Sequence, residues 1–501
     1  MGGFFGVVSE NDCVADLFYG TDYHSHLGTV RGGMAVTNEN GTIIRSIHDI
    51  SNSLFRSKFD NDLTAFKGSR CGIGVISDLD DQPLIIGSHF GTYSIVTVGR
   101  LNNIEELTRE AINVHHIHFA EQMMGAFNPT EVVASLINTK ETIEEGIAFV
   151  MEKVKGSCSL LLMIDGKIYA ARDRYGRTPM TLGRKIDGTG IAVSMETSAF
   201  PNLDYVKEYD LGPGEIAVLT EHTITRKKEP EKQMQICSFL WVYFGFPSSD
   251  YEGRNTETVR NANGSKIALD DPFAKDIDSV CGIPDSGVGH AIGYSNTAGK
   301  PYLRALVKYT PTWLRSFTPT NQISRNLIAK MKLLPVDEQI ANKKLLFLDD
   351  SIVRGTQFRN IARKLYERKA KEVHLRSSSP PTAFPCYFLN FSRSKAVEEL
   401  IARKIIRELE GNDPSPEVLR EYLTSGSERY NRMVEEIRKR LGLTSLRYQT
   451  LEKLVEAIGL PKEKVCTFCF DGCDPTGCAK CLGCVLPAEE NASQKDQNSC
   501  R

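Results

Sequence analysis

The chain contains the stretch LLFLDDSIVRGT at residues 345–356, which carries its clearest structural signal. Four apolar residues predict a short buried strand, two carboxylates follow it, and a helical pattern continues over residues 357–368. Asp349 and Asp350 would stand at the carboxyl end of the strand, where carboxylates can bind ribose hydroxyls or hydrated Mg²⁺. A tight turn with an Asp cap is the plainer alternative, but the order of strand, acids, small residues and helix favours an anion site.

The loop itself has the composition of a phosphate cradle. Its backbone N–H groups, the hydroxyl groups of Ser351 and Thr356, and the N-terminus of the following helix can all face an anion. Gly355 lets the backbone approach such a ligand closely. Apolar runs at residues 278–283 and 371–376 predict neighbouring strands, and strands that alternate with helices indicate a parallel α/β sheet.

The first 220 residues have a different pattern, with short strands, Gly-rich turns and interspersed helices, which predicts a layered α/β sandwich. The expected strands are 4–8, 32–37, 94–98, 158–164, 167–171 and 215–219, and the expected helices are 103–112, 130–137 and 142–154. The charged stretch 226–231 is interpreted as a solvated linker, and residues 412–441 as charged helices.

Composition limits the class of protein. The 501 residues include 61 Lys+Arg and 63 Asp+Glu, so the formal net charge of −2 argues against a generic nucleic-acid binder. No run of about 18 apolar residues predicts a membrane span, and residues 1–6 carry no secretion signal. We therefore expect a cytoplasmic protein with neither a membrane nor a nucleic acid as its partner.

Cysteines gather near the C-terminus: six of the 13 lie between Cys466 and Cys484. The CxxC pair Cys466 and Cys469, the odd total and the absence of a secretion signal favour ligation of a metal or cluster over a disulfide framework. A second group stands at Cys473, Cys478, Cys481 and Cys484. For this group a second metal site, with zinc as one form, and exposed thiols both stay open.

Residues 345–356 closely resemble the ribose-phosphate loop of type I phosphoribosyltransferases, and within them most resemble the glutamine phosphoribosylpyrophosphate amidotransferase (amidophosphoribosyltransferase) family. Three further segments support the resemblance. IPDSGVGHA at residues 283–291 is similar to the family's pyrophosphate loop, KYTPTWLRSFTP at 308–319 stands at its flexible catalytic loop, and residues 378–388 resemble the segment after the next strand. The 308–319 match lacks one basic position of the family pattern.

The resemblance implies a role for each matching residue. Asp349 and Asp350 would bind the ribose and Mg²⁺, with Ser316 as a further metal contact. Lys308 and Arg315 would close over the pyrophosphate and offset charge on the leaving group. The remaining substrate-binding residues form two sets: Asp285, Ser286 and Gly287 for pyrophosphate; Ser351, Arg354, Gly355 and Thr356 for the 5′-phosphate.

Some members of the family hold a [4Fe–4S] cluster, and Cys237, Cys386, Cys466 and Cys469 match its ligand positions. The resemblance therefore implies a cluster that attaches the C-terminal residues to the junction between domains. A Cys₄ zinc site and free thiols are the alternatives.

The N-terminal half resembles the family's glutaminase domain, an αββα sandwich of the N-terminal-nucleophile type, through FFGVV at 4–8, GTVRGGMA at 28–35 and ARDRYGRTP at 171–179. The nucleophilic cysteine of that domain aligns with Gly2, which has no nucleophile. The family's carboxylate binder, oxyanion hole and amine binder align with residues 75–78, 97–100 and 128–129, whose side chains differ from the pattern. The resemblance thus implies a glutaminase outline without glutaminase chemistry.

The resulting hypothesis has three domains: glutaminase-like 1–235, phosphoribosyltransferase 236–465, and a Cys-rich tail 466–501. The enzyme would form 5-phosphoribosylamine from phosphoribosyl pyrophosphate and ammonia, which is free or comes from a separate source. A transferase with another nucleophile and a non-enzymatic sensor of phosphoribosyl pyrophosphate or nucleotides are the rivals. The resemblance also implies a homo-oligomer and inhibition by purine nucleotides.

Overall fold

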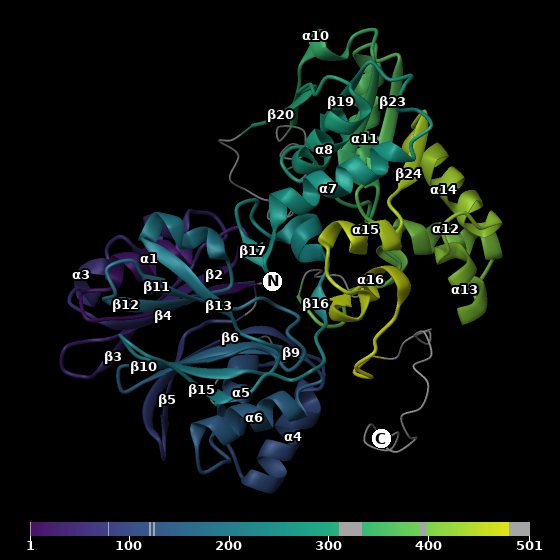
Figure 1. Ribbon diagram of the computed structural model, residues 1–501. Coiled ribbons are helices and arrows are strands. Elements are labelled where there is room, and N and C mark those ends of the chain that lie inside the picture. Colours follow the sequence, from purple (N-terminus) through teal and green to yellow (C-terminus); the bar gives the residue numbers. More distant parts are fainter. Residues whose placement is uncertain are drawn as a thin grey trace.

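The computed structural model has two α/β halves that meet along a shared core (Figure 1). It describes residues 2–78, 80–119, 122–123, 126–309, 333–390 and 397–479. Among these residues, no helix is long and apolar enough to cross a membrane.

The N-terminal half is built on two antiparallel sheets packed face to face. The first sheet has the strand order β13-β11-β12-β1-β4-β2-β3 and the second has the order β15-β14-β10-β9-β6-β5. The strands of the first sheet are β1 Gly3–Ser9, β2 Arg31–Thr37, β3 Ile43–Asp49, β4 Cys71–Ser77, β11 Thr181–Lys185, β12 Gly190–Ser194 and β13 Tyr205–Asp210. Those of the second are β5 Leu84–Ser88, β6 Gly91–Leu101, β9 Gly156–Ile164, β10 Lys167–Ala171, β14 Ile216–Leu219 and β15 Ile224–Lys228.

Helices cover the outer face of each sheet and complete four layers (Figure 1). Side chains alternate along each strand, so one set fills the space between the sheets and the other meets the helices. Phe4 and Val8 of β1 pack between the sheets, whereas Phe5 and Val7 pack against the first helices. The first sheet carries α1 Val14–Asp22, α2 Phe55–Phe59 and α3 Leu63–Phe66; the second carries α4 Ile104–His115, α5 Pro129–Ile137 and α6 Ile143–Lys153. The expected αββα sandwich is confirmed.

One sequence interpretation of this half is wrong. Residues 226–228 of the expected linker belong to β15, an edge strand paired with β14. Arg226 donates from Nε to Oε1 of Glu215 at 2.7 Å. The stretch is charged because it forms an exposed sheet edge. Lysine and arginine side chains on such an edge prevent it from pairing with a strand of another chain.

The C-terminal half contains a four-stranded parallel sheet with the order β19-β22-β23-β24. Its strands are β19 Ser279–Gly282, β22 Lys344–Asp349, β23 Glu372–Ser377 and β24 Ser445–Tyr448. Side chains of β22 alternate between the two cores: Leu346 and Leu348 face one, and Leu345 and Phe347 face the other. The expected parallel sheet is confirmed.

Both faces of this sheet are covered by helices, as a parallel sheet requires. One face packs against α7 Thr256–Leu269 and α8 Val288–Ala298, and the other against α11 Thr356–Glu367, α12 Ile401–Glu410, α13 Pro416–Leu423 and α14 Glu428–Leu441. A separate hairpin pairs β20 Leu306–Lys308 with β21 Leu333–Pro335, and α10 Asp337–Ile340 follows it.

Between the halves, strands far apart in sequence pair in parallel. β16 Ile236–Cys237 lies beside β25 Val465–Cys466, with Cys237 opposite Cys466. The junction also holds a π-helical turn Leu240–Phe244, the hairpin β17 Asp250–Tyr251 with β18 Arg254–Asn255, α15 Leu451–Ile458 and α16 Phe468–Asp471. Its apolar side chains share one core with the space between the N-terminal sheets, so the halves are packed together.

Candidate functional site

The carboxylates Asp349 and Asp350 stand at the carboxyl end of β22, where the sequence predicted them. Asp349 ends the strand and accepts a hydrogen bond at Oδ1 from the hydroxyl of Ser286, at 3.0 Å. The backbone N–H of Asp350 donates to the same oxygen at 3.0 Å, and the Ser351 hydroxyl donates to the Asp350 carboxylate. Two loops that are 63 residues apart in sequence therefore meet on one carboxylate.

Burial controls the ionisation of this acidic pair. Asp350 has 9% of its surface exposed, and removal from water raises the pKa of both carboxyls. The charge of Asp350 raises the pKa of Asp349 further, and that pKa lies well above its ordinary value. A divalent cation would relieve the repulsion between two carboxylates held side by side.

Ser286 belongs to the loop between β19 and α8, which the sequence predicted to hold pyrophosphate. Gly287 ends the loop at the start of α8. A Cβ at this position would lie 2.0 Å from the carbonyl oxygen of Leu348 and 2.7 Å from the backbone nitrogen of Ile283. Only glycine therefore fits where the loop crosses over β22.

The predicted 5′-phosphate loop runs from Ser351 to the start of α11. Gly355 precedes the helix with φ of 72°, in the left-handed region that glycine adopts without strain. Thr356 is the first residue of α11 and is exposed to solvent. Arg354 projects into solvent and forms an ion pair with Glu399.

Of the predicted loop cations, Lys308 ends β20, and its Nζ lies 2.6 Å from Oδ2 of Asp285. Both side chains are exposed, so this pair can open for a ligand at small cost. Arg315 and Ser316 lie outside the described residues.

Sequence reasoning missed two charged neighbours of this site. Arg260 on α7 is 4% exposed, and its guanidinium donates to the carbonyl oxygens of Trp241 and Gly245 at 2.9 and 2.8 Å. Its charge lowers the pKa of Asp350, against the larger effect of burial. Glu399, which forms an ion pair with Arg354 of the phosphate loop, was also missed. Neither residue belongs to a motif, so the sequence held no signal for them.

In the N-terminal half, the position that aligns with a glutaminase nucleophile is closed. A Cβ on Gly2 would lie 2.5 Å from the carbonyl oxygen of Ile76 and 3.5 Å from Cγ2 of Val98. Ile76 and Val98 are themselves buried. Cys13 directly precedes α1 in the outer core of the first sheet, and burial raises the pKa of its thiol well above the ordinary value. A side chain at position 2 would therefore clash with the backbone of Ile76, and Cys13 is a buried thiol.

The neighbouring positions support the local fold instead. Asp78 accepts hydrogen bonds from the backbone N–H and the hydroxyl of Thr29, at 2.7 and 3.1 Å. Asn128 caps α5 by accepting from the N–H of Thr130 at 2.9 Å. The backbone N–H of Thr97 donates to the Gln82 side chain at 2.6 Å. The Asp78 and Asn128 side chains and the backbone N–H of Thr97 are therefore engaged in hydrogen bonds within the protein.

The four cysteines predicted as cluster ligands come together at the junction of the halves. Cys237 and Cys466 are opposed in the β16–β25 pair, Cys469 lies in α16, and Cys386 accepts at Sγ from the N–H of Leu389 at 3.3 Å. Burial raises the pKa of each thiol, and every pair among the four interacts electrostatically. Within the described ranges, no group of three or more His, Cys, Asp or Glu side chains is close enough together to bind one metal ion.

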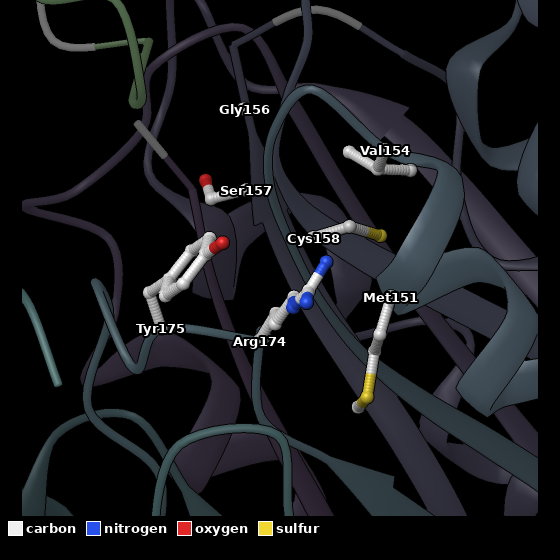
Figure 2. A pocket seen from close by; sticks show the side chains of 7 residues that line it. All are labelled: Met151, Val154, Gly156, Ser157, Cys158, Arg174 and Tyr175. Carbon is white, nitrogen blue, oxygen red and sulfur yellow. The ribbon is translucent and has the colours of Figure 1, made fainter. Parts of the chain in front are cut away.

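Of the second cysteine group, Cys473 and Cys478 lie within the described residues, and Cys481 and Cys484 lie outside them. Cys473 is disulfide-bonded, so the expectation of a metal ligand or an exposed thiol is wrong for this residue. Cys478 is a half-buried free thiol close to Tyr175. A cavity nearby is lined by Met151, Val154, Cys158, Arg174 and Tyr175 among others (Figure 2). Its volume of about 10 Å³ admits about one water molecule, so it is too small for a metabolite.

The parallel sheet, with its acidic pair and anion loop, defines a type I phosphoribosyltransferase half, and the αββα sandwich defines a glutaminase-type half. A family model described as a glutamine amidotransferase domain matches residues 69–202. The amidophosphoribosyltransferase of Methanocaldococcus jannaschii is 31% identical over 504 residues, covering 95% of this chain and 98% of that protein. The Mycobacterium tuberculosis protein of the same name is 29% identical, covering 94% of this chain and 85% of that protein.

Solved structures agree with this assignment. The glutamine phosphoribosylpyrophosphate amidotransferase from B. subtilis, solved with ADP and GMP, superimposes with a TM-score of 0.80 at 27% identity, covering 95% of this chain and 98% of that one. A structure titled as the allosteric regulatory enzyme of purine biosynthesis gives 0.79 at 26% identity. The chain belongs to the amidophosphoribosyltransferase family, a family of pentosyltransferases.

Proposed function

We propose that this chain forms 5-phosphoribosylamine from phosphoribosyl pyrophosphate and ammonia as a step of purine nucleotide synthesis. One observation carries the proposal: the Ser286 hydroxyl meets the Asp349 carboxylate, which joins the predicted pyrophosphate and ribose sites. In the reaction a C–N bond forms at C1 of the ribose as the C–O bond to pyrophosphate breaks. The pyrophosphate takes the electron pair, and the proton lost from nitrogen passes to solvent.

The chain's own residues position the substrate and offset charge. The N–H groups at the start of α8 and α11 would face the pyrophosphate and the 5′-phosphate, because helix N-termini attract anions. Lys308 would leave Asp285 and approach the leaving group. Arg354 would leave Glu399 in the same way. Arg315 has its role from the resemblance alone. Holding C1 and the nucleophile in line supplies most of the rate.

Asp349 and Asp350 fit the requirements of Mg²⁺, which proteins bind through one or two carboxylates together with substrate phosphates and water. When bound, Mg²⁺ would offset the negative charge of the pyrophosphate. Ser286 and Ser351 hold the two carboxylates in place before any ligand arrives. Ser316 is a further proposed contact.

Ammonia, rather than glutamine, is the proposed nitrogen donor. The contact between Gly2 and the Ile76 carbonyl supports this, because no side chain fits where the nucleophile would stand. The loss of a single oxyanion-hole donor already costs about 3–4 kcal/mol of transition-state stabilisation. Here the nucleophile and the binding positions are absent together.

We further propose that Cys237, Cys386, Cys466 and Cys469 hold a [4Fe–4S] cluster. Four thiols that all interact, two of them buried and two half-buried, are a suitable donor set for iron or zinc. A Cys₄ zinc site needs sulfurs within about 4 Å of one another, because each Zn–S bond is about 2.3 Å. Within the described residues, no group of three or more His, Cys, Asp or Glu stands ready to hold a metal ion, so the choice of a cluster over zinc rests on the resemblance.

Two further properties are proposed from relatives. The B. subtilis enzyme was solved with ADP and GMP, which supports inhibition of this chain by purine nucleotides. A homo-oligomer is proposed on the resemblance alone.

The test is release of pyrophosphate from phosphoribosyl pyrophosphate and Mg²⁺ by anaerobically purified protein. Ammonium alone should support release, and glutamine alone should not. Release with glutamine would contradict the interpretation of the N-terminal half. Release with neither donor would refute the proposed reaction, provided that the protein is folded.

A further inference from the structure

Arg177 connects the four-thiol site to a segment for which the proposed reaction has no use. The residue follows β10 in the N-terminal half, and its side chain is 1% exposed. Its Nη1 donates to Sγ of Cys466 at 3.3 Å. The guanidinium lies over the ring of Phe388 with its carbon 3.3 Å from the ring centre, and Nε has no hydrogen-bond partner in the described part of the chain. A buried cation thus faces one of the proposed ligands directly.

The other side of the guanidinium holds the segment 473–479, which we call the cover segment. Nη2 lies 3.3 Å from Oδ1 of Asp474 and donates to the hydroxyl of Thr476 at 3.0 Å. The Asp474 side chain is completely buried and accepts from the N–H of Ala479 at 2.8 Å. Gln233 donates to the carbonyl oxygen of Pro475 at 3.2 Å.

The apolar side chains of the cover segment pack near the four-thiol site. Ala479 and Cys478 pack into the core cluster that also contains Cys237 and Cys466. A buried ion pair such as Arg177–Asp474 is a poor source of stability by itself, because desolvation offsets most of the attraction. Its geometry instead fixes the direction of a cation and the position of the segment beside the guanidinium that contacts Cys466.

Four thiolates around a [4Fe–4S] cluster or a zinc ion leave a net negative charge in a buried place. An N–H group that donates to a ligand sulfur stabilises that charge, and hydrogen bonds to sulfur and exclusion of solvent both set the potential of a cluster. Arg177 supplies the first effect, and the cover segment that it holds supplies the second.

We propose that Arg177 is a positioning residue of the four-thiol site, which holds the sulfur of Cys466 directly and holds the cover segment over the bound group through Asp474. The inference rests on the proposed cofactor. It adds that retention of this cofactor depends on Arg177, a residue of the glutaminase-like half. In this arrangement, a domain without glutaminase chemistry still contributes to the retention of the cofactor.

The experiment compares four anaerobically purified full-length proteins: the wild type, Arg177→Met, Asp474→Asn and the control Arg174→Met. Arg174 lies on the same turn but is exposed, beside the small cavity of Figure 2. Iron, sulfide and zinc content are measured first. The rate of metal loss to a chelator, the reduction potential if iron is present, and proteolysis within the cover segment follow.

We expect Arg177→Met to lose metal about 10–100-fold faster than the wild type, the usual range for a residue that supports a metal ligand. Its cluster potential should be more negative, because a hydrogen bond to sulfur is lost. Asp474→Asn should show faster proteolysis of the cover segment and faster metal loss. Arg174→Met should match the wild type in every readout.

The outcomes separate the two proposals. A wild type that contains neither iron nor zinc would overturn the cofactor and, with it, this inference. A loaded wild type whose Arg177→Met and Asp474→Asn variants retain metal, potential and protease resistance would overturn the inference alone. If Arg177→Met fails to fold by circular dichroism, Asp474→Asn decides the result, since it conserves volume while it removes the charge and one of the two acceptor oxygens.

Discussion

Gly287→Ala should inactivate the transferase by a purely steric route. Gly287 has φ of −85°, an ordinary value, so an alanine there suffers no backbone strain. The added Cβ would lie 2.0 Å from the Leu348 carbonyl oxygen, whereas ordinary contacts begin at 3.4 Å. The loop must therefore retreat by roughly 1.4 Å, and displacements of about 1 Å near a reacting centre cost about 100-fold in rate.

The same clash should lower the free energy of unfolding by about 1–3 kcal/mol, the usual cost of overpacking. Gly289→Ala is the matched control, because the two nearest atoms to its Cβ are carboxylate oxygens of Glu257 at 2.7 and 2.9 Å. These atoms end a flexible side chain and can move, the third neighbour is Cβ of Arg260 at 3.0 Å and needs a shift of only a few tenths of an ångström, and alanine favours the helix by about 1 kcal/mol.

The assay is ammonium-dependent pyrophosphate release together with urea unfolding of each variant. Gly287→Ala should lose about 100-fold in kcat/KM, and Gly289→Ala should stay within about threefold of the wild type. Wild-type activity in Gly287→Ala would refute the view that this loop binds the leaving group. Equal losses of kcat/KM in both variants would show that any substitution at the start of α8 impairs the enzyme. The clash with the Leu348 carbonyl would then not explain the effect of Gly287→Ala.

Three other predictions concern single groups. Asp350→Asn should abolish pyrophosphate release while the protein stays folded by circular dichroism; retained activity would remove the acidic pair from the mechanism. Arg376→Met should cost about 3–5 kcal/mol in urea unfolding, because it leaves the buried carboxylate of Asp271 without its cation. Adding Asp271→Leu should recover most of that loss, and failure to do so would contradict the ion-pair argument. Burial lowers the pKa of His24 to about 4 and that of His290 to about 3; the unfolded chain binds these protons near pH 6.5, so stability should fall by about 3 kcal/mol per histidine as the pH falls from 6.5 to 4. His24→Gln should flatten the measured dependence of the urea midpoint on pH, and an unchanged slope would exclude His24 as a cause.

The sequence predicted the elements in which local pattern and packing agree. The expected strand 167–171 matches β10 residue for residue, and the expected strand of four apolar residues, 345–348, lies within β22. In both cases the strand contains a short run of apolar residues. The edge strand β15 was missed because its charged side chains look like those of a linker, and its pairing with β14 is not visible in its own composition.

Site residues were predicted where one loop carries the whole signal. The acidic pair lies where the motif placed it, since strand and loop are continuous in sequence. Contacts across the fold were not predictable in this way. Arg260 near Asp350 and Arg177 on Cys466 depend on how the halves pack, and the residues in the second contact are 289 positions apart. The assigned roles and domain boundaries remain predictions, and Arg315 and Ser316 lie outside the described residues.

The pairing of β16 with β25 has a consequence for synthesis on the ribosome. The core between the N-terminal sheets is completed by residues 234–242 and by residues near 465–470. A nascent chain that has finished all of its N-terminal strands therefore still exposes part of that apolar surface. The surface stays uncovered until residue 470 has left the exit tunnel, which at about 5–20 residues per second is a delay of tens of seconds. During that time the unfinished chain is a natural client for a chaperone that binds exposed apolar surface.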